Sequence, residues 1–153
     1  MGRVMRLAIA GVGNNISALL QGVYFYRDLL KRDGEKARYP GIRHPHVGGM
    51  HVSDVAIVAA FDVQPQKVGQ DLGSAIFQPP NNYPELDVEV PQQGVKVALG
   101  LSLDENGKLV GQDEVVAEIQ RCDADTLLYS LPTGMQWAAD GYAQCCLDAG
   151  VGF

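Results

Sequence analysis

The stretch Leu7-Ala8-Ile9-Ala10-Gly11-Val12-Gly13-Asn14-Asn15-Ile16-Ser17 decides the fold. Its first four residues form a short apolar run, which is typical of a buried strand, and the glycines that follow allow a tight turn. From Ile16 to Leu30, apolar residues recur at helical spacing. The stretch therefore predicts a strand, a glycine-rich loop and a helix in succession.

The rest of the chain alternates between strands and helices in the same way. We expect strands at residues 55–61, 95–99 and 126–130, and helices at residues 65–72, 113–122 and 136–149. Asp113 is the predicted N-cap of its helix, residues 103–111 are turn-rich, and residues 151–153 resemble the start of another strand. This order predicts an α/β fold, a Rossmann-like parallel sheet flanked by helices with right-handed crossovers. Since the chain stops inside this pattern, we expect a sheet truncated before it is complete.

Composition and charge narrow the class of protein. With 153 residues, 46% of them apolar, the chain suits one domain over residues 1–153, and a net charge of -6 argues against a nucleic-acid surface. No apolar run approaches the ~20 residues of a membrane span. The N-terminus leads directly into a predicted strand without a cleavable signal. We therefore expect a cytoplasmic protein that binds neither nucleic acid nor membrane.

The glycine-rich loop is typical of a dinucleotide site. Gly11 suits the bend, and Gly13 allows close approach of a pyrophosphate, which the N-terminus of the following helix attracts. Asn14, Asn15 and Ser17 add polar groups within reach of phosphate oxygens. The loop alone also fits a tight turn that merely connects a strand to a helix.

Asp62 ends the second predicted strand and strengthens the nucleotide interpretation. A carboxylate at this place accepts hydrogen bonds from the adenosine ribose hydroxyls, and its charge opposes the 2′-phosphate of NADP. We therefore predict NAD as the cofactor, although a turn or helix-cap aspartate is the alternative. The distance from Gly11 to Asp62 exceeds the usual ~20 residues, and the long stretch from Arg32 to Asp54 accounts for the excess.

That long stretch, an inserted loop at about residues 32–54, is a candidate functional segment or oligomer contact. It holds His44, His46 and His51, but their spacing fits no zinc pattern, so we predict no metal site. The cysteines, two of them adjacent at 145 and 146, are expected to be small buried hydrophobic residues rather than a disulfide framework.

Dispersed segments of the chain resemble myo-inositol-3-phosphate synthase in its shorter prokaryotic form. The resemblance runs nearly end to end and includes the histidine-bearing stretch. The segments are Gly11-Val12-Gly13-Asn14, Gln21-Gly22-Val23, Pro40-Gly41, His51-Val52-Ser53-Asp54, Ala59-Ala60-Phe61-Asp62-Val63, Lys67-Val68-Gly69, Ala75-Ile76-Phe77, Tyr142-Ala143-Gln144 and Asp148-Ala149-Gly150.

The resemblance implies an NAD-dependent isomerase that converts glucose 6-phosphate to inositol 3-phosphate through oxidation, enolisation, aldol closure and re-reduction. It implies that Gly11, Gly13, Asn14 and Ser17 line the pyrophosphate and that Asp62 meets the ribose. It also places the turn Leu131-Pro132-Thr133-Gly134 near the cofactor. Asn15, Ile16 and the pair Tyr129-Ser130 depart from the family pattern and affect how the cofactor sits.

Family members continue into a domain that holds the lysines and acids for catalysis. Cyclisation needs a positioned acid or base and a cation for the enolate, and none of the chain's lysines lies in a predicted strand-end turn. We therefore expect a cofactor-binding part, either a natural short form or a truncated gene product, that cannot complete the reaction alone. Glucose 6-phosphate becomes a ligand only if the missing domain is supplied.

Two other functional classes of protein remain as alternatives. One is a non-catalytic nucleotide-binding or assembly module, which forms a homo-oligomer or pairs with a full-length synthase through an unfinished sheet edge. The other is a simple NAD-dependent dehydrogenase, for which the sequence shows no catalytic acid or base.

Overall fold

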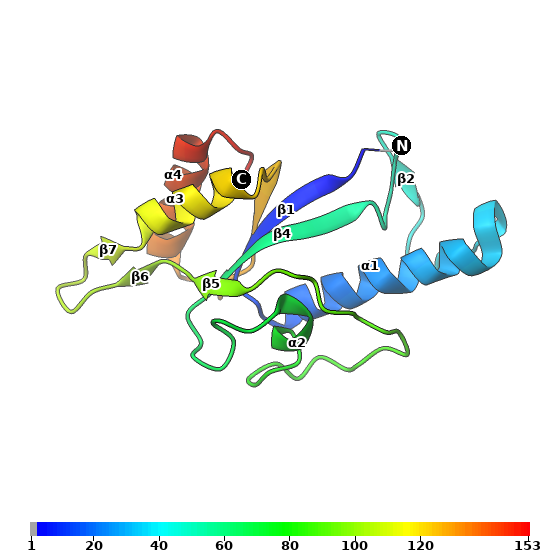
Figure 1. The fold of residues 1–153 in the computed structure, drawn as a ribbon, viewed down its shortest axis with the longest axis horizontal. Helices are drawn as coiled ribbons and strands as arrows, with labels where there is room; N and C mark the ends of the chain where they lie inside the picture. Colours follow the sequence, from blue (N-terminus) through cyan, green and yellow to red (C-terminus); the bar gives the residue numbers. More distant parts are fainter. Residues whose placement is uncertain (1–2) are drawn as a thin grey trace.

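The computed structural model describes residues 3–153, and its centre is a parallel sheet (Figure 1). Four strands form this sheet in the order β5-β4-β1-β8, and every neighbouring pair is parallel. Their bounds are β1 Met5–Ala10, β4 Val55–Asp62, β5 Val97–Leu99 and β8 Thr126–Tyr129. The expected parallel α/β sheet is confirmed. Gly152 also forms a parallel bridge with Thr126 on the outer side of β8, as expected for residues 151–153.

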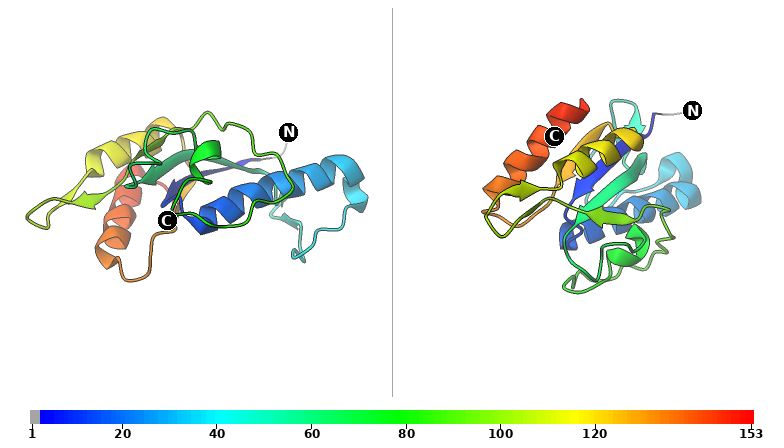
Figure 2. Two further views of the ribbon diagram at one scale, coloured as in Figure 1. Left: turned by 90° about the horizontal axis from the view of Figure 1, so that it is seen from below. Right: turned by 60° about the vertical axis from the view of Figure 1, so that its left-hand side comes forward.

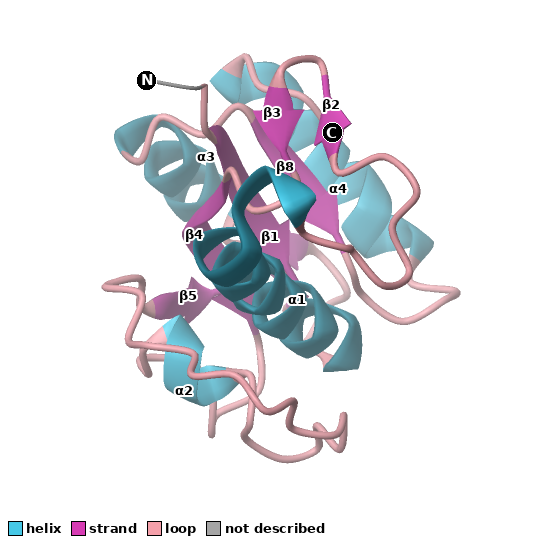
Figure 3. Ribbon diagram, turned by 90° about the vertical axis from the view of Figure 1, so that its right-hand side faces the viewer, coloured by secondary structure: helices cyan, strands magenta, loops and turns pink. Residues whose placement is uncertain are grey.

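Helices cover both faces of the sheet, as Figures 2 and 3 show. On one face, α1 and α2 pack against Ile9, Ile57 and Val97. On the other, α3 and α4 pack against a second cluster that includes Phe61 and Leu127. The bounds are α1 Asn14–Asp33, α2 Leu72–Ala75, α3 Gln112–Arg121 and α4 Gln136–Ala149. The strands are therefore buried on both faces, which explains their near-continuous apolar runs.

Two expectations about local structure are wrong. The segment expected to form a helix at residues 65–72 is mostly a series of turns, and the short helix α2 begins only at Leu72. Asp71 caps α2, because its side chain accepts a hydrogen bond from Gly73 N. Gly69 N donates to Val97 O at 2.8 Å, so this segment runs along β5 instead of coiling. Asp113 is not an N-cap: Gly111 holds that position, with a φ of +95°.

The long stretch after α1 is partly ordered into regular structure. A 3-10 turn, η1 (Gly34–Lys36), is followed by an antiparallel hairpin of β2 (His46–Val47) and β3 (Met50–His51). A second hairpin, β6 (Ser102–Leu103) with β7 (Leu109–Val110), spans the region expected to be turn-rich. The cysteines at 122, 145 and 146 are unpaired and buried, as expected. Within residues 3–153, no helix combines the length and the apolar character that crossing a membrane requires.

Candidate nucleotide-binding site

The sheet topology selects one edge as the candidate site. From β1 the chain moves outward to β4 and β5, and then returns to place β8 on the other side of β1. The strand order therefore reverses between β1 and β8. In open α/β sheets, ligands bind at the carboxyl ends of the strands beside this switch point. The glycine-rich loop follows β1 and the turn 131–134 follows β8, so both lie at this edge.

Gly11 is the tightest point of the site. Its φ is +92°, which is the region that favours glycine. A Cβ built on it would lie 2.5 Å from the carbonyl oxygen of Ser130 and 2.8 Å from Cδ2 of Leu131. The Gly11 N–H donates to Phe61 O at 2.8 Å. The loop thus lies between the ends of β4 and β8, with Leu131 beside it.

Gly13 is the N-cap of α1 and has a different environment. Its φ of -91° and ψ of -166° suit any residue, and a Cβ built on it would meet nothing within 4 Å. Asn14 follows, and its Oδ1 accepts hydrogen bonds from the backbone of Asn82 at 2.9 Å and of Tyr83 at 3.1 Å. Asn15 is exposed at the same helix end. The side chain of Asn14 therefore ties another loop to the site.

Ser17 lies deeper than the other predicted phosphate ligands. It is buried on the inner side of α1, and its Oγ accepts a hydrogen bond from Gln21 Nε2 at 3.1 Å. Gln21 Oε1 in turn accepts one from Leu86 N at 2.7 Å. The fold therefore gives the Ser17 hydroxyl a place in the contact between α1 and the segment 84–86.

Asp62 is buried at the end of β4, and its carboxylate accepts three backbone hydrogen bonds. Its Oδ2 accepts a hydrogen bond from Val12 N at 2.7 Å, and its Oδ1 accepts from Val63 N at 2.8 Å and Gln64 N at 2.9 Å. An ionised carboxylate offers about four acceptor sites, so one remains. The carboxylate therefore shapes the glycine-rich loop directly, which its position in the sequence did not reveal.

Lys67 and Asn81 also contact the glycine-rich loop, and sequence reasoning missed both. Lys67 Nζ donates to Val12 O and to Asn81 Oδ1, each at 2.7 Å. The expectation that no lysine lies in a strand-end turn is thus wrong, because Lys67 belongs to the turn after β4. Burial lowers the pKa of this lysine, and the negative charge of Asp62 opposes that effect. Lys67 follows Asp62 by only five positions in the sequence, which could have indicated a place near the end of β4. The helix predicted for residues 65–72 hid this signal.

The turn after β8 borders a surface pocket of about 210 Å³ at the same edge. Pro132, Thr133 and Gly134 are exposed there, and Tyr129 closes the turn by donating its hydroxyl to Met135 O at 3.1 Å. The predicted residues, together with Lys67 and the segment 81–83 that the sequence did not indicate, thus lie at one edge of the sheet in four loops. These are residues 11–15, 62–67, 81–83 and 131–134.

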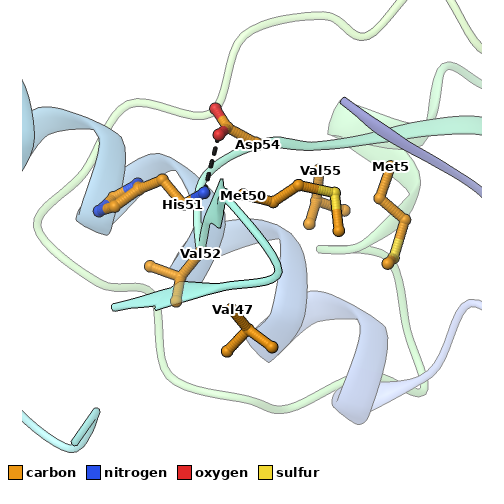
Figure 4. Close-up of a pocket in the computed structure, with 7 residues that line it drawn as sticks. All are labelled: Met5, Val47, Met50, His51, Val52, Asp54 and Val55. Atoms are coloured by element: carbon orange, nitrogen blue, oxygen red, sulfur yellow. Dashed lines mark hydrogen bonds between the residues drawn. The ribbon is translucent and has the colours of Figure 1, made fainter. Parts of the chain in front are cut away.

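A second cavity, of about 160 Å³, lies at the opposite ends of the strands and is apolar. Met5 and Val55, which begin β1 and β4, line it together with the β2–β3 hairpin. Figure 4 shows Met5, Met50 and Val55 gathered on one side, whereas the imidazole of His51 points to the other. This cavity is far along the strands from the glycine-rich loop and is not part of the candidate site.

His51 is a buried histidine whose surroundings disfavour its protonated form. It is buried, its Nδ1 accepts a hydrogen bond from Ser53 N at 3.2 Å, and its Nε2 has no partner among the described residues. Burial lowers the pKa of His51, and His46 lowers it further, while Asp54 opposes the change. In the folded state His51 therefore stays neutral at a pH where the unfolded chain, with a pKa of about 6.5, is already protonated.

We expect the free energy of unfolding to decrease as the pH falls below about 6.5, because the unfolded state then binds more protons. Urea unfolding at pH 7.5 and 5.5 measures the effect. The variant His51→Gln should show a smaller decrease between the two values, and His44→Gln, at an exposed position, should behave like the unmodified chain. Equal decreases in all three proteins would contradict this role of His51.

Comparison with known proteins confirms the resemblance seen in the sequence. The chain is 41% identical to inositol-3-phosphate synthase of Mycolicibacterium smegmatis, in an alignment that covers 97% of this chain and 42% of that protein. It is 39% identical to the protein of the same name from Mycobacterium tuberculosis and 37% identical to that from Corynebacterium glutamicum, with the same coverage. The chain thus spans less than half the length of these relatives. No protein-family profile matches it.

Solved structures agree with the fold. A crystal structure of a protein named Ari2 superposes with a TM-score of 0.89 at 46% identity, covering 97% of this chain and 44% of that one. A myo-inositol-1-phosphate synthase-related protein from Thermotoga maritima superposes with a TM-score of 0.53 at 19% identity, covering 93% of this chain and 41% of that one. At this identity the second likeness concerns the fold alone.

Proposed function

We propose that this chain, which is homologous over 97% of its length to inositol-3-phosphate synthases, is the NAD-binding part of such an enzyme. One observation carries the proposal. An open glycine, Gly13, begins the 20-residue helix α1 at the edge where the strand order reverses between β1 and β8. In the complete enzyme, the reaction would convert glucose 6-phosphate to inositol 3-phosphate.

The residues present fit a dinucleotide. The first N–H groups of a helix have no acceptor inside the helix, and the helix dipole adds positive potential there. At Gly13 the space that a Cβ would occupy is empty to 4 Å, whereas at Gly11 the protein itself fills it. A pyrophosphate therefore fits beside Gly13, Asn14 and Asn15, while Gly11 serves the packing of the loop.

Asp62 fits the adenosine ribose in a restricted way. Three backbone N–H groups already bind its carboxylate, so we assign it one ribose hydroxyl through the remaining acceptor site on Oδ2. The same negative charge disfavours a 2′-phosphate, and NAD is therefore the proposed cofactor rather than NADP. When bound, NAD would supply a hydride acceptor. The turn at residues 131–134 would border the cofactor from the side of β8.

Gly13→Ala is expected to abolish NAD binding and to leave the fold intact. The added methyl group meets no protein atom within 4 Å and suits the backbone angles, so the free energy of unfolding should change by less than about 1 kcal/mol. It would occupy the place of the pyrophosphate. Calorimetric titration of the 153-residue chain with NAD, next to thermal unfolding, measures both effects.

The proposal requires the unmodified chain to bind NAD and to prefer it to NADP. Gly22→Ala is a suitable control, because its Cβ also meets nothing within 4 Å but lies inside α1, outside the site. It should retain NAD binding. Undetectable binding of NAD to the unmodified chain at millimolar concentration would refute the proposal, and so would full binding by Gly13→Ala.

A further inference from the structure

Val12, in the middle of the glycine-rich loop, is held from both sides by charged side chains. Its N–H donates to Asp62 Oδ2 at 2.7 Å. Its carbonyl oxygen accepts hydrogen bonds from Lys67 Nζ at 2.7 Å and from Asn81 Nδ2 at 3.1 Å. Lys67 is 2% exposed. A buried ammonium group is costly unless it is paired, so its place against one backbone carbonyl and the amide oxygen of Asn81 requires an explanation.

The direction of the next N–H group follows from the Val12 carbonyl. The carbonyl of Val12 and the N–H of Gly13 belong to one planar trans peptide, in which the two groups point in opposite directions. Since Lys67 and Asn81 fix the carbonyl, they also fix the Gly13 N–H, which points away from them. A positive charge at the carbonyl end polarises the peptide and makes its N–H a stronger donor.

The positive charge of Lys67 also offsets the negative charge of Asp62 at the glycine-rich loop. Asp62 carries a negative charge within hydrogen-bond distance of the loop, and alone it would repel an anionic ligand at the same edge. The ammonium group of Lys67 faces that carboxylate from the other side of Val12 and opposes its field. The two side chains together leave the loop close to neutral, so the N-terminus of α1 determines the local potential.

We propose that Lys67 is a positioning residue for the diphosphate of the dinucleotide: it orients the Val12–Gly13 peptide so that the Gly13 N–H binds a phosphate oxygen, and it offsets the charge of Asp62. The inference rests on the proposed function, because it concerns the same site. It extends that function to a residue beneath the loop that does not touch the ligand.

The test compares three ligands and two variants. Lys67→Met should weaken the binding of NAD and of ADP at least tenfold, and that of adenosine less than threefold, because adenosine has no phosphate. Lys108→Met removes the same charge at an exposed position in the β6–β7 hairpin and should change none of the three. Calorimetric titration supplies the dissociation constants, and circular dichroism verifies the fold of each variant.

A measurement on the unmodified chain keeps the inference testable if Lys67→Met fails to fold. Burial lowers the pKa of Lys67, and Asp62 is the ionisable group that faces it. The affinity for ADP should therefore fall as the pH rises toward the ordinary lysine pKa of about 10.4, as the ammonium group is lost, while that for adenosine stays constant. Lys108→Met should show the same pH profile as the unmodified chain.

The outcomes separate the two proposals. If the unmodified chain binds neither NAD nor ADP, the proposed function and the role of Lys67 both fail. If it binds NAD, and Lys67→Met binds equally well or loses adenosine as strongly as ADP, the positioning role alone fails. A pH profile for ADP that stays flat up to the ordinary lysine pKa of about 10.4 would likewise overturn that role.

Discussion

Replacing Gly11 with alanine is expected to lower the free energy of unfolding by roughly 2–5 kcal/mol and to abolish NAD binding. The variant combines two costs. Its φ of +92° is unfavourable for an L-residue, at about 1–2 kcal/mol. The new Cβ would lie 2.5 Å from Ser130 O, a backbone atom between the end of β8 and the turn that follows, so the loop or the strand must move.

A second glycine separates the two costs. Gly107 has a φ of +75° in the turn of the β6–β7 hairpin, and a Cβ built on it meets nothing within 4 Å. Gly107→Ala therefore carries the backbone cost alone, about 1–2 kcal/mol, and should keep NAD binding. Urea unfolding of both variants measures the difference. Equal stabilities would show that the contact between Gly11 and Ser130 has no energetic weight.

The elements with strong periodic signals could be predicted from the sequence. The strand at residues 55–61 and the helix at residues 136–149 agree with β4 and α4, because continuous apolar runs and a glycine stop reflect burial and local capping. The segment at residues 65–72 was misassigned because Pro65 suits a helix start. There, the Gly69 N–H donates to Val97 O, and the Val97 N–H donates to Gln70 O. These two hydrogen bonds decide the structure, and such long-range pairing leaves no periodic pattern in the sequence.

In the candidate site, too, residues with a local sequence signal could be predicted, and residues placed by long-range contacts could not. Gly11 and Asp62 were identifiable because their roles follow from position, at the ends of two predicted strands. Lys67 and Asn81 were not, because their contacts with Val12 span 55 and 69 positions along the chain. The role predicted for Asp62 was also incomplete. The sequence indicated a contact with the ribose, whereas the structure shows a carboxylate that first organises the backbone of the loop.

Asp62→Ala is consequently expected to destabilise the chain by about 3–5 kcal/mol, the range for removing one partner from a buried charged network. It removes three hydrogen bonds to backbone N–H groups, those of Val12, Val63 and Gln64. Leaving the N–H of the buried Val12 unpaired costs more than its bond contributed, whereas Val63 and Gln64 are exposed and add less. NAD binding should also be lost at temperatures where the variant remains folded, since Val12 is no longer fixed beside Gly13.

Asp71 supplies the control that distinguishes loss of stability from loss of the site. Its carboxylate also accepts three backbone hydrogen bonds, from Gly73 N, Gln93 N and Gly94 N, at 2.8 to 2.9 Å. It is the N-cap of α2, and none of these three hydrogen bonds involves the glycine-rich loop. Asp71→Ala should therefore lower the urea midpoint to a similar extent, yet bind NAD with the affinity of the unmodified chain when measured well below its unfolding transition. If Asp62→Ala, equally folded, binds NAD normally, then Asp62 neither orders the loop for the cofactor nor contacts its ribose. If both variants lose binding, the effect of Asp62 reflects instability alone.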